Sequence, residues 1–191
     1  MRAVVAGVWL LVVLQVPACA TDLVREDGRL VFRSLGFAID DPGAGPQAGW
    51  SAHRVEGALL SFRAPDGATL SLVQKCGPLP GDLQILAREL LIGLEERQIE
   101  EEAAVTVNGA PGWRIVARVA YEGRAVRLHT VTRRLGECSL DWIAVAPLER
   151  VGLGAEFDAW WASFRAAPAA EAAGPGDAAP GAAAGPGKGT P

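Results

Sequence analysis

Residues 58–94 read ALLSFRAPDGATLSLVQKCGPLPGDLQILARELLIGL, so a strand pattern is followed directly by a helix pattern. Pro65-Asp66-Gly67 is a strong turn signal between two apolar runs, which predicts a β-hairpin with strands over 58–63 and 69–74. Asp82 is a good helix N-cap, and the leucines after it recur at helical spacing, which predicts a helix. We expect the glutamate-rich run 95–102 to be the charged, solvated end of that helix.

The pattern continues on both sides of this stretch. Short strands are predicted before it, over 36–39 and 50–55. After it, the alternation of apolar and polar residues predicts a meander of strands and then a last helix, over 104–107, 113–121, 124–134, 137–146 and 153–166. The order of strands, helix, meander and helix indicates an α+β domain, with an antiparallel sheet and helices packed on it.

This arrangement resembles a known superfamily. Gly36-Phe37-Ala38-Ile39, then Trp50, then ALLSFRAPDGATL over 58–70, followed by a helix, a meander and a closing aromatic helix, is similar to the PsbP-like superfamily. Its members include extrinsic photosystem proteins and many small bacterial lipoproteins. The resemblance spans most of residues 34–166 and implies an α/β/α sandwich. Because members mostly bind or stabilise other proteins, it also implies a non-enzymatic accessory role.

The N-terminus has the pattern of a signal peptide. Met1-Arg2 is positively charged, residues 3–14 are apolar, and small residues follow, whereas a membrane span needs about 20 residues. Two cleavage sites remain open. Val16-Pro17-Ala18-Cys19 resembles a lipobox, which gives a signal peptide of 1–18 and a lipid on Cys19; Ala18-Cys19-Ala20 reads as an A-x-A site, which gives 1–20. Because Ala20 rather than Asp follows Cys19, we expect the lipid-anchored protein on the periplasmic face of the outer membrane.

Three further segments follow the leader. Residues 19–33 are expected to be a polar tether, residues 34–166 the domain, and residues 167–191 a disordered tail of alanine, glycine and proline. The net charge of −4 becomes −5 once Arg2, the only charged leader residue, is removed. This mild acidity argues against nucleic acid as the main partner.

The cysteines predict a disulfide. With Cys19 assigned to the leader or to the lipid, Cys76 and Cys138 remain, and an oxidising compartment favours their pairing; two buried free thiols are the alternative. His53 and His129 are the only histidines, and the chain has no Cys-x-x-Cys spacing. We therefore predict no metal site and no cofactor.

No catalytic residues are predicted. Gly49-Trp50-Ser51-Ala52-His53 half-resembles a Gly-x-Ser-x-Gly elbow but lacks the final glycine and leads into a strand, so Ser51 is expected to be a solvent-facing strand serine. Gly152-Leu153-Gly154 lacks the third glycine of a dinucleotide loop and is expected to start a helix. The acidic run 95–102 is expected to be a solvated face.

Two features suggest binding. If the strands on either side of Glu122-Gly123 pair, the basic side chains on their polar faces form one cationic patch that could bind an anionic partner. The alternative is that these side chains are simply solvated or ion-paired. They are Arg114, Arg118, Arg127, His129 and Arg133. The second feature is the aromatic stripe of the last helix, which we expect to be core. Since two adjacent tryptophans cannot both point inward, one should sit at a groove rim; the candidates are Trp160 and Trp161.

Two hypotheses follow. The first is a non-enzymatic, membrane-anchored envelope lipoprotein that binds another envelope protein as an accessory or scaffold. The alternative is a carrier that holds a small apolar ligand or a lipid between the sheet and the C-terminal helix.

Overall fold

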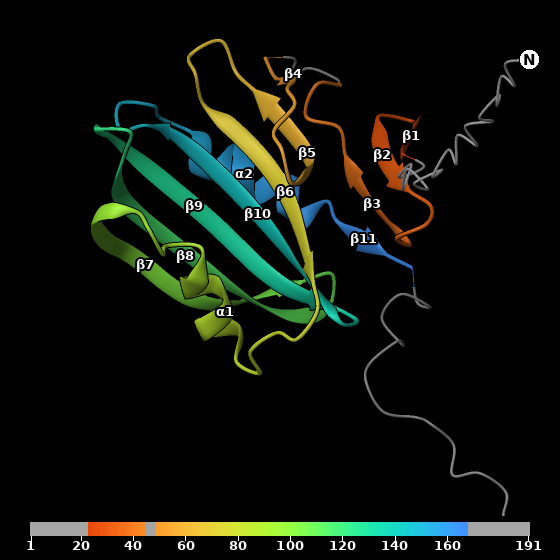
Figure 1. Ribbon diagram of the computed structural model, residues 1–191. Helices are drawn as coiled ribbons and strands as arrows, with labels where there is room; N and C mark the ends of the chain where they lie inside the picture. The colour runs from red at the N-terminus through yellow and green to blue at the C-terminus, as the bar shows by residue number, and fades with distance from the viewer. Residues whose placement is uncertain (1–22, 45–48, 168–191) are drawn as a thin grey trace, which may run out of the picture.

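The computed structural model describes residues 23–44 and 49–167. The signal peptide, the lipidation of Cys19 and the tail from 168 onward lie outside the described residues and remain predictions. Within them the α+β layout is confirmed, with strands far outnumbering helices (Figure 1).

A seven-stranded antiparallel sheet forms the centre of the domain, in the order β4-β5-β6-β10-β9-β8-β7. The hairpin around Pro65-Asp66-Gly67 is confirmed as β5 and β6. The meander is confirmed as β7 to β10, each paired with the next along the chain. The strands of this sheet are β4 (Ser51–Ala52), β5 (Ala58–Arg63), β6 (Thr69–Cys76), β7 (Glu95–Val107), β8 (Ala110–Tyr121), β9 (Arg124–Leu135) and β10 (Cys138–Pro147).

A second antiparallel sheet has the order β1-β2-β3-β11. Its strands are β1 (Leu23–Glu26), β2 (Arg29–Phe32), β3 (Phe37–Asp40) and β11 (Arg165–Ala166). The tether predicted over 19–33 is therefore wrong from Leu23 onward. Leu30 and Phe32 are both 1% exposed because they pack into the main core, which fixes this segment to the domain.

The helices α1 (Leu83–Glu89) and α2 (Leu153–Ala162) lie on opposite faces of the large sheet (Figure 1). One face packs against α2 and the small sheet and contains the larger core, with Trp142, Phe157 and Phe164 fully buried. The other face packs against α1 over a smaller cluster that includes Ile115 and Ala117. Since strand side chains alternate between faces, β9 and β10 contribute to both layers, for example Trp142 to the larger core and Ile143 to the smaller cluster.

The glutamate-rich run is a strand and not the end of a helix. The helix α1 ends at Glu89, and Gly93 turns the chain with φ of 84°. Residues 95–107 then pair with β8 as the sheet's edge strand, where charged side chains reach water and discourage pairing with other chains. The last helix is also shorter than predicted, because residues 165–166 leave it to pair with β3.

Two smaller boundaries also move. The strand predicted over 50–55 is limited to β4, and Ala167, assigned to the tail, donates its backbone N–H to the carbonyl of Gly36 at 2.7 Å. The predicted disulfide is present: Cys76 and Cys138 face each other across β6 and β10 and are bonded, with Cα atoms 4.0 Å apart.

Candidate functional site

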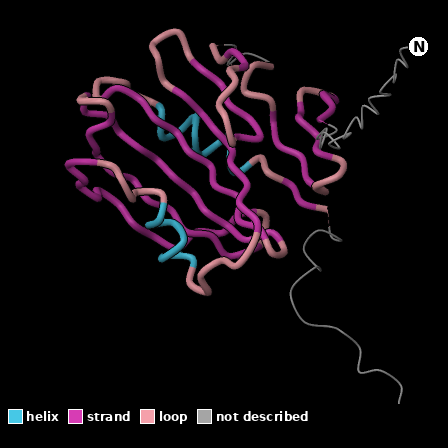
Figure 2. Tube along the Cα trace, in the orientation of Figure 1, coloured by secondary structure: helices cyan, strands magenta, loops and turns pink. Residues whose placement is uncertain are grey.

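One hollow lies beside α1, on the sheet face opposite α2. The helix has only seven residues and packs mainly on β8 and β9, so it covers one corner of this face (Figure 2). Beyond the helix, residues of β8, β9, β10 and β6 form an open floor. We call this hollow of about 580 Å³ the α1 groove.

The floor and one wall of the α1 groove are apolar. Val119 and Leu128 are buried in it, at 3% and 5% exposure. Val126, Ile143 and Val145 are half-buried around them. The wall consists of two leucines in the segment directly after α1, Leu90 and Leu94. Polar residues border this apolar centre; they include His53, Arg63, Asp66, Glu122 and Arg124.

The helix α1 is held in place by one carboxylate, Glu102, which was predicted to lie on a solvated face. Glu102 on β7 accepts hydrogen bonds from Arg88 at 2.9 and 2.6 Å, from Gln84 at 3.1 Å and from the Trp113 indole at 3.0 Å. The hydrogen bond from Arg88 is the main reason that the pKa of Glu102 is lowered to about 2. Two residues of α1 and one of β8 are thus joined through a single side chain.

A second carboxyl is buried in the same sheet. Asp141 on β10 is 4% exposed and accepts hydrogen bonds from Thr132 at 2.7 Å and Ser139 at 3.4 Å. Burial raises its pKa. Thr130, on the same face of β9 and lining the α1 groove, has a buried hydroxyl with no partner among the described residues.

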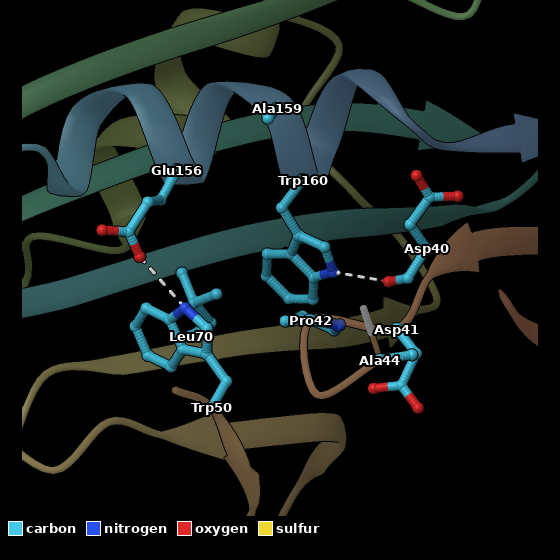
Figure 3. A pocket seen from close by; sticks show the side chains of 9 residues that line it. All are labelled: Asp40, Asp41, Pro42, Ala44, Trp50, Leu70, Glu156, Ala159 and Trp160. Atoms are coloured by element: carbon cyan, nitrogen blue, oxygen red, sulfur yellow. Dashed lines mark hydrogen bonds between the residues drawn. The ribbon is translucent and has the colours of Figure 1, made fainter. Parts of the chain in front are cut away.

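The predicted groove at the tandem tryptophans is only partly found. Trp160 borders a hollow of about 290 Å³ with Trp50 across from it (Figure 3). Trp160 donates its indole N–H to the carbonyl of Asp40 at 3.2 Å, and Trp50 donates to Glu156 at 3.0 Å. Trp161 is not part of this hollow; it donates to Asp158. Both indole N–H groups in the hollow are therefore already used within the protein.

The predicted basic side chains share one face of β8 and β9, as expected from their spacing. That face, however, is the one on which α2 packs. His129 and Arg133 are buried, at 6% and 2% exposure, and Arg133 donates to the carbonyl of Val107 and stacks over Phe164.

The remaining three arginines are ion-paired. Arg114 pairs with Asp158 of α2 and with Glu101 of β7, while Arg118 and Arg127 both pair with Glu100. These five residues therefore form no open cationic patch. The prediction failed because α2 covers one part of the face and the acidic edge strand neutralises the rest.

Ser51 and the Gly152–Gly154 segment, which half-resemble functional motifs, both have local structural roles. Ser51 donates its hydroxyl to the carbonyl of Arg63 at 3.0 Å, as expected of a strand serine. Gly152 is the N-cap of α2, so the glycine pair does start a helix. Within residues 23–44 and 49–167, no cluster of His, Cys, Asp and Glu could hold a metal ion, and no helix is long and apolar enough to cross a membrane.

Comparison with known proteins gives a fold. No family model and no curated sequence matches the chain. Among solved structures, it is similar to the cyanobacterial PsbP protein CyanoP from Synechocystis, with a TM-score of 0.50 and 16% identity over 72% of this chain and 91% of that one. It also matches LpqN of Mycobacterium tuberculosis, a protein involved in cell envelope biogenesis, with a TM-score of 0.49 and 18% identity over 63% of this chain and 79% of that one. The chain thus has a PsbP-like fold.

Proposed function

We propose that this protein is a non-enzymatic, membrane-anchored accessory protein of a bacterial envelope, which binds another envelope protein through the α1 groove. The observation that carries the proposal is the uncovered apolar floor of that groove. Apolar surface of this kind, bordered by polar residues, is typical of protein interaction sites. Its volume of about 580 Å³ is large enough for several apolar side chains of a partner.

The predicted signal peptide and the disulfide support the proposed location. A bonded Cys76–Cys138 pair is characteristic of proteins outside the cytoplasm. If Cys19 carries the lipid, only residues 20–22 separate it from β1, which begins at Leu23. Four residue steps reach at most about 14 Å, so the small sheet would be held close to the bilayer. The anchor would then restrict which partners the groove can reach.

The packing does not favour the ligand-carrier hypothesis. The space between the sheet and α2 is filled by Phe157, Trp160 and Phe164, all of them buried in the main core. The hollow beside Trp160 is half the size of the α1 groove, and its indoles are hydrogen-bonded internally. Native mass spectrometry of the purified protein decides the point, because a carrier would retain a bound ligand.

The test of the proposal is affinity purification from detergent-solubilised envelopes, using the full chain and two matched variants. Val126→Asp places a charge on the groove floor, whereas Ile92→Asp places the same charge on a residue that is 73% exposed and outside the groove. A partner should be recovered in equal amount with the wild type and with Ile92→Asp, and should be lost with Val126→Asp.

Urea denaturation of both variants must show that they remain folded. Equal recovery with Val126→Asp, or repeated recovery of no stoichiometric partner with any of the three proteins, would contradict the proposal. The anchor is tested separately by metabolic labelling with a radioactive fatty acid, which should label the wild type but not Cys19→Ala.

A further inference from the structure

We infer that the N-terminus of α2 forms, with His129 and Arg127, a binding site for a phosphate-type oxyanion. The site is a hollow of about 300 Å³ between the first half of β9, the end of β10 and the start of α2. It lies on the opposite sheet face from the α1 groove and does not depend on the function proposed above.

The helix start provides unpaired donors. The backbone N–H groups in the first turn of any helix have no partner within the helix, and they carry the positive end of its dipole. In α2 the N-cap is Gly152, which has no side chain to accept these hydrogen bonds, and no other cap bond is formed by the described residues. Gly152, Leu153 and Gly154 all border the hollow, so the free end of the helix faces it.

His129 is an independent indication of a ligand. It is 6% exposed, yet neither ring nitrogen has a hydrogen-bond partner among the residues the structure describes. Buried polar groups are almost always paired, so two unpaired nitrogens on one ring require an explanation. The ring faces the first turn of α2: a Cβ added at Gly154 would lie 3.4 Å from its Cε1 and 4.0 Å from its Nδ1.

Arg127 adds to the site a guanidinium that is already ion-paired with Glu100. It borders the hollow beside His129, and its side chain is 30% exposed and shares Glu100 with Arg118. Donors from a helix start, an imidazole and a guanidinium converge on one space, which is the chemistry that binds phosphate.

The charges around the imidazole set its protonation. Burial lowers the pKa of His129, Arg114 and Arg127 lower it further, and Asp158 and Glu101 oppose them. A bound oxyanion would stabilise the imidazolium and raise that pKa; by reciprocity, the anion should bind more tightly as the pH falls. The charged groups near the hollow come from β7, β8, β9, α2 and the loop before α2. They are Glu100, Glu101, Arg114, Arg127, Arg150, Glu156 and Asp158. Arg150 pairs with Glu156 and Asp66.

The experiment is an NMR titration of the mature full-length protein with inorganic phosphate. We expect shifts in the amides of residues 153–155 and in the His129 ring, and a higher His129 pKa when phosphate is present. The ring of His53, the only other histidine and an exposed one, should not move. Absence of change at residues 153–155 and His129 at millimolar phosphate would overturn the inference.

Matched variants exclude a general charge effect. Arg127→Gln and Arg118→Gln each remove one of two neighbouring arginines that share Glu100, but only Arg127 borders the hollow. Arg127→Gln should weaken phosphate binding about tenfold or more, as expected for loss of one charged hydrogen bond, and Arg118→Gln should leave it unchanged. Equal weakening by both would overturn the inference.

The source of the anion is distinguished by a second titration, with vesicles of phosphatidylglycerol. Shifts of the same resonances would identify a lipid headgroup as a ligand, and shifts with inorganic phosphate alone would identify a free phosphate. Either result supports an oxyanion site, because both require binding at residues 153–155 and His129.

Discussion

Replacing Glu102 by glutamine should loosen α1 from the sheet without changing the shape of the side chain. The carboxylate holds Arg88 and Gln84 of α1 and the indole of Trp113. Glutamine can still accept from Trp113 but removes the charge that binds Arg88. Since the segment directly after α1 forms the wall of the α1 groove, the same substitution should also weaken partner binding if the proposed function is correct.

The size of the effect follows from the pKa of Glu102. Lowering this pKa from 4.5 to about 2 corresponds to roughly 3 kcal/mol of stabilisation of the folded state, at about 1.4 kcal/mol per pKa unit. Water screens part of this, because the Arg88 side chain is 53% exposed. We therefore expect Glu102→Gln to lower the free energy of unfolding at pH 7 by about 1–2 kcal/mol.

The difference in stability between wild type and Glu102→Gln should depend on pH in one direction. A carboxyl whose pKa is lowered on folding stabilises the protein above its unfolded pKa, and the stabilisation is lost as the pH falls toward the folded value. Wild type and Glu102→Gln should therefore differ most above pH 4.5 and converge near pH 2.

The assay is urea denaturation at several pH values, monitored by tryptophan fluorescence. Amide hydrogen exchange in α1 is measured as well. The exchange of α1 amides should increase in Glu102→Gln more than that of the central strands. Glu95→Gln, an exposed position at the start of the same strand, is the control and should have little effect. A difference between wild type and Glu102→Gln that is absent, or that stays constant from pH 7 to pH 3, would refute the reasoning.

Three further predictions concern stability. Reducing the Cys76–Cys138 disulfide, which joins residues 62 positions apart, should cost roughly 4 kcal/mol in urea denaturation. The intact mass of the protein should rise by two hydrogen atoms, and no rise in mass would exclude the bond. Gly112→Ala should lower the free energy of unfolding by about 1–3 kcal/mol, because its Cβ would lie 3.0 Å from a methyl group of Val107 and 3.1 Å from a backbone carbonyl oxygen. The control Gly81→Ala meets nothing within 4 Å and should be neutral. Equal melting temperatures of the two variants would contradict this prediction. Asp141→Asn should stabilise the protein at pH 7, because burial raises the pKa of Asp141, and the gain should disappear as the pH falls to 3.8; a gain independent of pH would refute it.

Local patterns in the sequence were sufficient for much of the fold. The hairpin at Pro65-Asp66-Gly67 and the N-cap at Asp82 were predictable because turns and caps depend on residues only a few positions apart. The burial of Phe157 and Phe164 followed from helical spacing of large aromatic side chains. The cysteine pair followed from counting, since only two thiols remained for an oxidising compartment.

Other features were decided by contacts between distant segments. A run of glutamates suits the exposed end of a helix and an edge strand equally well, and only pairing with β8 makes 95–107 a strand. The short apolar patch at Leu30 and Phe32 looked like part of a tether because its partners lie in β3 and the main core.

The binding surfaces depended on tertiary structure most of all. Alternation placed Arg114, Arg127 and His129 on one face of a sheet, but it could not say that α2 would cover that face. The α1 groove exists because a seven-residue helix packs on a seven-stranded sheet, a difference in area that no local pattern encodes. The sequence by itself determined which side chains share a face, since strand and helix periods are local; only the tertiary structure decided which faces are buried, because burial depends on what packs against them.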